Sequence, residues 1–217
     1  MSNARRARLF RSGIAGLVLA LNAGCGALLP KGAPPPSFYT LDSMPGGGAA
    51  AGTSPGSMAA PTLIVDLPGA ASGFDSQHIV YARGPHTHEY FSRSEWVDTP
   101  ARMLAPLIVA AVENGGAFRA VLLAPSVAAG EMRLDTQIVR LEQNFDAAPS
   151  RVRFTLRAYV VEDATRRVLA SREFDETVAA ASEDTYGGVV AANRAVHLVL
   201  EQLASFCSQA ALVWQNR

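Results

Sequence analysis

The cleanest structural pattern in the chain is RVRFTLRAYVV, residues 151–161. Every second residue from Val152 to Val160 is apolar, and arginine, threonine and tyrosine occupy the positions between them. Because successive side chains of a β-strand point to opposite faces, this alternation predicts a long strand with one dry face and one wet face. We expect the arginines of the wet face to be balanced by Glu142, Glu173 and Asp175.

Further strands flank this one on both sides along the chain. Residues 131–145 alternate in the same way until Val139 shifts the pattern, which indicates a β-bulge. The residues at 162–165 predict a hairpin turn into a strand over 167–178. Shorter apolar runs predict strands at 37–41, 62–67, 77–82, 88–92 and 118–123, with a turn at 83–85.

Two segments carry helical patterns. The first begins with Thr99 as a capping residue and Pro100 at the first helical position, and it ends at residues 114–116. Pro106 should kink this helix or split off its first turn. The second helix runs from about Asp184 or Tyr186 to Trp214. Its apolar stripe comprises Val189, Val196, Leu200, Leu203, Cys207, Ala210 and Trp214, after a gap at Asn193, and is widened by Val199, Phe206, Leu212 and Val213.

These elements predict a single α/β domain, with a mixed, largely antiparallel sheet packed against two principal helices. The spacing of Cys207 on the apolar stripe favours a small core residue over a reactive thiol. The domain spans 37–217. Within it, the Gly-, Ala-, Ser- and Pro-rich segment 45–61 has almost nothing to bury and is expected to form a flexible loop.

The N-terminus has the order of an export signal. Four arginines precede the apolar run 13–21, which is shorter than the ~20 residues that span a bilayer. The sequence Asn22-Ala23-Gly24-Cys25 follows and resembles the lipobox of bacterial lipoproteins, although Asn22 replaces the usual apolar residue. We therefore expect a signal peptide over 1–24, diacylglycerol and an acyl chain on Cys25, and a lipidated tether over 25–36. A plain signal peptide cut nearby, or a short membrane anchor, is the alternative.

The composition and motifs argue against several classes of function. Equal numbers of basic and acidic residues, 19 of each, disfavour a nucleic-acid partner. The chain carries no Gly-x-Ser-x-Gly, His-Glu-x-x-His, Gly-x-Gly-x-x-Gly or P-loop motif. His86 and His88 share a strand face and could bind a metal, but no third ligand is evident. We therefore expect no catalytic residues, no metal and no cofactor beyond the covalent lipid.

The order of short motifs resembles a known family. After the anchoring cysteine come Phe38-Tyr39-Thr40-Leu41, Ile79-Val80-Tyr81, Glu89-Tyr90-Phe91 and Glu95-Trp96, then a helix that opens with Thr99-Pro100, two long strands and a helix that ends in Trp214. This order resembles the ABC-type transport auxiliary lipoproteins, the group that includes paraquat-inducible protein C. The insertion after Met44, Pro106 and Asn22 depart from the family pattern.

The resemblance implies a non-catalytic lipoprotein of the outer membrane that faces the periplasm and accompanies an ABC/MCE lipid-transport system. Its partners would be an MCE-domain protein and the permease and ATPase of that transporter. Inner-membrane lipoproteins of enterobacteria carry Asp directly after the lipidated cysteine. This chain has Gly26 at that position, which favours the outer membrane. Tyr81, Tyr90, Phe91 and Trp96 form a possible docking surface, unless Tyr81, Phe91 and Trp96 merely close the core. The alternatives are an envelope lipoprotein of a lipopolysaccharide-export-like or Tol-like assembly, and a metal-dependent hydrolase.

Overall fold

The computed structural model describes residues 35–42 and 59–216, and its sheet is built around one long strand, β7 (Met132–Asn144). Along one edge β7 pairs antiparallel with β8 (Arg151–Glu162), which pairs antiparallel with β9 (Val168–Ala179). Along its other edge β7 pairs in parallel with three short strands in succession, β2 (Thr62–Val65), β3 (Gly69–Ala70) and β4 (His78–Ala82).

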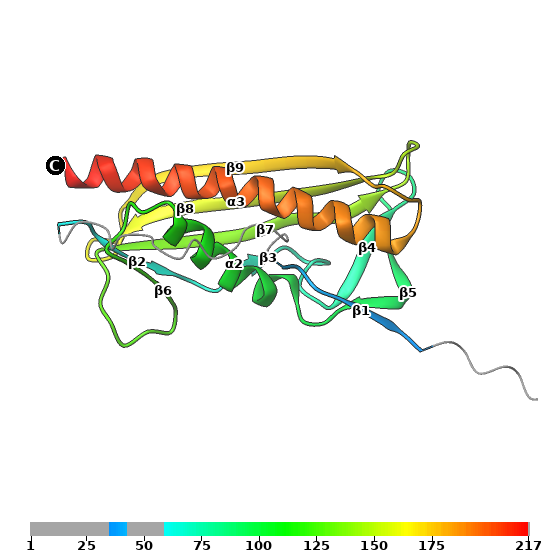
Figure 1. Cartoon of the computed structure of the whole chain (residues 1–217), viewed down its shortest axis with the longest axis horizontal. Coiled ribbons are helices and arrows are strands. Elements are labelled where there is room, and N and C mark those ends of the chain that lie inside the picture. The colour runs from blue at the N-terminus through cyan, green and yellow to red at the C-terminus, as the bar shows by residue number, and fades with distance from the viewer. Residues whose placement is uncertain (1–34, 43–58, 217) are drawn as a thin grey trace, which may run out of the picture. The chain divides into compact units, whose positions relative to one another are not determined.

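Three more strands widen the short-strand side. β6 (Ala120–Leu123) lies parallel to β2, β5 (Glu89–Trp96) antiparallel to β4, and β1 (Ser37–Tyr39) parallel to β5 (Figure 1). The α/β prediction of a mixed sheet with two principal helices is confirmed. Five of the eight pairings among the described residues are parallel, but the two long ladders, β7–β8 and β8–β9, are antiparallel.

Strand β8 has the two faces that its alternation predicts. On one face Val152, Phe154, Leu156, Ala158 and Val160 are buried. On the other face Arg153 pairs with Asp175 and Arg157 with Glu173, each at 2.7 Å. Glu142 pairs with Arg140, two residues before it on the same strand. The predicted bulge is also confirmed, because the β7–β8 register shifts between Ile138 and Arg140.

Helix α3 (Thr185–Gln215) covers the dry face of β8 and β9 and packs beside the second helix (Figure 1). Its first turn is capped by Asp184, whose Oδ1 accepts a hydrogen bond from the Gly187 N–H at 2.8 Å. Of the described helices, only α3 is long and apolar enough to cross a membrane, and its apolar stripe is instead buried against the sheet. The prediction that Leu212 and Val213 widen this stripe is wrong: both side chains are exposed.

Helix α2 (Pro100–Asn114) runs unbroken through Pro106, so the predicted splitting of its first turn does not occur. Pro106 has no N–H to donate to the carbonyl of Arg102, four residues earlier. Both residues lie on the exposed face of α2, where water can form a hydrogen bond with that carbonyl. Thr99 occupies the N-cap position but makes no capping hydrogen bond with its side chain. Its backbone carbonyl instead accepts hydrogen bonds from the N–H groups of Arg102 and Met103.

The gap in the apolar stripe of α3 at Asn193 has a structural role. The Asn193 side chain donates to the Thr40 carbonyl at 3.1 Å, and its Oδ1 accepts a hydrogen bond from the Asp42 N–H at 2.9 Å. A polar amide at this point of the stripe therefore fixes the chain just after β1 against the helix. The predicted signal peptide, Cys25, the predicted tether before Pro35 and residues 45–58 of the predicted loop lie outside the described residues.

Candidate functional site

Three aromatic rings gather where β4, β5 and the end of β7 meet. The ring of Tyr81 lies 4.5 Å from that of Phe91 and 5.8 Å from that of Phe145, measured between ring centres. Tyr81 is in register with Gln143, whose side chain contacts the Asp184 carbonyl, so the rings lie on the α3 side of the sheet. All three rings are only half-buried. We call Tyr81, Phe91 and Phe145 the aromatic cluster.

Two charged groups frame the aromatic cluster. The guanidinium of Arg83 lies 5.3 Å above the rings of both Tyr81 and Phe145, a distance at which a cation is attracted to an aromatic face. The Tyr81 hydroxyl donates a 2.6 Å hydrogen bond to Glu89. This hydrogen bond raises the pKa of Tyr81, and the hydroxyl remains protonated at neutral pH. The cluster thus combines apolar area with a fixed donor, acceptor and cation, as interface centres do.

The structure brings together only two of the four aromatic residues in the predicted docking surface. Tyr81 and Phe91 are in contact, whereas Tyr90 lies against the His78 ring at 4.8 Å and Trp96 is buried in the core. Tyr90 and Phe91 are neighbours on β5 and therefore point to opposite faces of the sheet. The pairing of β5 with β4 is also irregular, because Ile79 of β4 faces residues 91–94 of β5. This odd offset reverses the in–out alternation between Tyr90 and Trp96.

Phe145 and Arg83 complete the cluster and were missed from the sequence. Phe145 was placed at the end of the strand 131–145, two residues after Gln143, so the alternation already assigned these two residues to one face. Arg83 stood in a predicted turn, and nothing in the sequence indicated that it would fold back over the rings.

Of the two histidines considered as a metal site, His88 has other neighbours. His88 Nε2 lies 3.1 Å from a carboxylate oxygen of the buried Glu142, and its ring packs near Phe74. The ring of a third histidine, His78, faces Tyr90 and Glu95. Over residues 35–42 and 59–216, no three metal-binding side chains come together.

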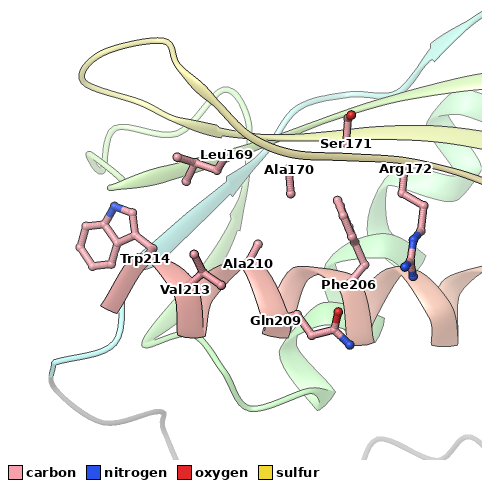
Figure 2. Close-up of a pocket in the computed structure, with 9 residues that line it drawn as sticks. All are labelled: Leu169, Ala170, Ser171, Arg172, Phe206, Gln209, Ala210, Val213 and Trp214. Carbon is pink, nitrogen blue, oxygen red and sulfur yellow. The ribbon is translucent and has the colours of Figure 1, made fainter. Parts of the chain in front are cut away.

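A groove of about 260 Å³ lies at the C-terminal end of α3, beside the start of β9. Figure 2 shows Ala170 and Arg172 reaching from β9 towards the helix, and Trp214 standing at one end. The Arg172 guanidinium lies 5.7 Å from the centre of the Phe206 ring. The groove thus has a mixed lining of apolar and polar side chains, with Arg172 as its cation.

Comparison with known proteins connects this fold to a family. A family model described as "ABC-type transport auxiliary lipoprotein component" matches residues 39–204. A comparison with curated proteins finds no match.

Solved structures are similar in fold. A Xanthomonas campestris protein of the family DUF330 superposes with a TM-score of 0.68 at 23% identity, covering 73% of this chain and 89% of its own. An uncharacterised protein superposes with a TM-score of 0.60 at 11% identity, covering 81% of this chain and 98% of its own. At these identities the likeness concerns the fold alone.

Proposed function

Because the chain belongs to the family of ABC-type transport auxiliary lipoprotein components, we propose that it is a non-catalytic, lipid-anchored subunit of an ABC/MCE lipid-transport system. In this proposal Cys25 carries diacylglycerol and an acyl chain that hold the protein on the periplasmic face of the outer membrane. The domain then receives the end of the conduit that the transporter extends across the periplasm.

The observation that supports docking most directly is the aromatic cluster. Three half-buried rings and a stacked arginine on one surface match the composition of protein interfaces, where aromatic residues and arginine are enriched. The partner that we propose for this surface is the MCE-domain protein, with the permease and the ATPase joined through it. A lipopolysaccharide-export-like or Tol-like assembly would require a different partner on the same surface.

The experiment is a binding measurement with the MCE-domain protein of the same bacterium. We expect the purified lipoprotein to bind it, and Phe91→Ala to weaken binding by about tenfold or more, as truncation of an interface anchor does. Tyr90→Ala is the matched control, because Tyr90 is an exposed aromatic residue of the same strand that lies outside the cluster.

Two results would contradict this proposal. Absence of binding by the wild-type protein would exclude the MCE partner. An equal loss of affinity in Tyr90→Ala and Phe91→Ala would exclude the aromatic cluster as the docking surface. Circular dichroism of each variant establishes that the fold is retained.

A further inference from the structure

A second group of exposed apolar residues lies where the described chain begins. Phe38 on β1 is 58% exposed, and on the first two turns of α3 Tyr186 is 63% and Val190 is 47% exposed. The half-buried ring of Tyr39 lies 6.5 Å from the ring of Tyr186. Phe38 points to the opposite face of β1, because successive side chains of a strand alternate, so these residues flank the strand on both sides. We call Phe38, Tyr39, Tyr186 and Val190 the aromatic edge.

The aromatic edge is fixed in place. Among the described residues β1 is an edge strand, paired with β5 alone, and Asn193 binds the backbone at Thr40 and Asp42 directly after it. Tyr186 and Val190 are four residues apart on α3 and therefore share one side of the helix. In Figure 1, β1 and the start of α3 lie at the same end of the domain, opposite the C-terminus. The exposed rings are thus held on regular structure.

The position of this edge in the chain indicates what would cover it. Phe38 follows Cys25 by thirteen residues, and a chain of that length reaches at most about 47 Å. An acyl anchor on Cys25 would therefore hold the aromatic edge near the bilayer at an effective concentration in the millimolar range. At that concentration even a weak preference of the rings for the bilayer gives a populated contact.

The chemistry of the edge fits a membrane–water interface. Tyrosine is enriched there because its ring is apolar and its hydroxyl is polar, and phenylalanine is common on the apolar face of helices that lie in this layer. The charged residues beside the edge are mainly acidic: Asp42, Glu183, Asp184, Arg194, and Glu95, which is in register with Phe38. The contact must therefore be driven by apolar area rather than by attraction to anionic headgroups.

We propose that the aromatic edge rests in the interfacial layer of the membrane that carries the anchor, so that α3 points away from the bilayer and its C-terminal groove faces the periplasm. This inference rests on the proposed lipid anchor. It adds the orientation of the domain, which leaves the C-terminal end of α3 accessible to other molecules.

The test uses the full lipidated protein, purified from bacterial membranes and reconstituted in phosphatidylcholine vesicles. Two variants, Tyr186→Cys and Val213→Cys, each carry one nitroxide label. Val213 is the matched control, because it lies on the same helix with a similar exposure of 61%, about 40 Å further along at 1.5 Å per residue. Cys207 should not be labelled, because it is buried and burial raises the pKa of its thiol to about 12.

The measured quantities are the collision rates of each label with oxygen, which enriches in the bilayer, and with a water-soluble nickel chelate. We expect the label at 186 to lose nickel accessibility several-fold and to gain oxygen accessibility, while the label at 213 keeps the accessibility of a free surface. A Phe38→Ser substitution added to the Tyr186→Cys protein should restore part of the nickel accessibility.

Three results would overturn the inference. Equal nickel accessibility at 186 and 213 would mean that the edge does not enter the membrane. Loss of nickel accessibility at 186 without a gain of oxygen accessibility would mean that protein, such as a second copy of the chain, covers the edge. Protein that fails to float with the vesicles would have no lipid anchor. That result would contradict the proposed function, and the inference that rests on it as well.

Discussion

Replacing Gly188 by alanine tests how α3 is seated on the sheet. An added Cβ would overlap the Oε1 atom of the buried Gln143 and would lie 2.7 Å from its Cδ. Gln143 cannot yield without consequence, because its Nε2 donates a 2.9 Å hydrogen bond to Ser150 Oγ, which is also buried. The substitution must therefore either strain the junction of β7, the start of β8 and α3 or break this hydrogen bond.

The magnitude follows from three contributions to the free energy of unfolding. Overpacking of a tight site costs about 1–3 kcal/mol. Loss of the hydrogen bond, with its buried partner left unpaired, costs about 1–3 kcal/mol. The better helix propensity of alanine returns up to about 1 kcal/mol. We expect a net loss of about 2 kcal/mol, which lowers Tm by roughly 4–8 °C in a chain of this size.

The assay is urea and thermal unfolding of the soluble Cys25→Ser protein, followed by circular dichroism, with and without Gly188→Ala. The control is the same substitution in a Gln143→Ala background, where the clashing side chain is absent. There the cost of Gly188→Ala should vanish, which gives a coupling free energy of about 1 kcal/mol or more between the two positions. An equal cost in both backgrounds would refute the reasoning, since the clash with Gln143 would then not be its source.

Three further predictions concern the same protein. Asp184→Ala removes the cap of α3 and should lower the urea midpoint of unfolding, and an unchanged midpoint would contradict this prediction. Leu203→Ala should cost about 2–5 kcal/mol, because Leu203 is fully buried, whereas Leu212→Ala at an exposed position should have almost no effect. Burial and the neighbouring Asp66 raise the pKa of Asp135 to about 6, so the folded state keeps a proton that the unfolded chain releases near pH 4. Stability should therefore fall as pH rises from 4 to 6. The urea midpoint of unfolding, measured across this range, should fall with pH in the wild-type protein and fall less in Asp135→Asn.

The parts of the fold that sequence predicted well are those in which local pattern and burial agree. The alternation at 151–161 needs only the two-residue period of a strand, and the shift at Val139 marks a bulge that the β7–β8 register confirms. Asp184 was one of two proposed starts of the last helix, and its side chain is the cap in the structure. Each of these features is determined within about a dozen residues.

The predictions that were wrong depend on contacts between distant segments. Leu212 and Val213 are apolar, but both are exposed. Whether an apolar side chain of a helix is buried depends on the elements packed against it, and the helical periodicity alone does not show this. The order of the four docking residues in the chain does not show which of them share a surface. The irregular pairing of β5 with β4 separates Tyr90 from Trp96, and Phe145 joins the cluster from 54 residues beyond Phe91.

In the proposed function, acyl chains on one cysteine hold this domain at a membrane. Growth of the bacterium with labelled palmitate, followed by purification of the protein and of a Cys25→Ser form, tests it most directly. We predict label in the wild-type protein, no label in Cys25→Ser, and release of Cys25→Ser from the outer-membrane fraction. An unlabelled wild-type protein, or a Cys25→Ser form that stays in the membrane like the wild type, would contradict the account.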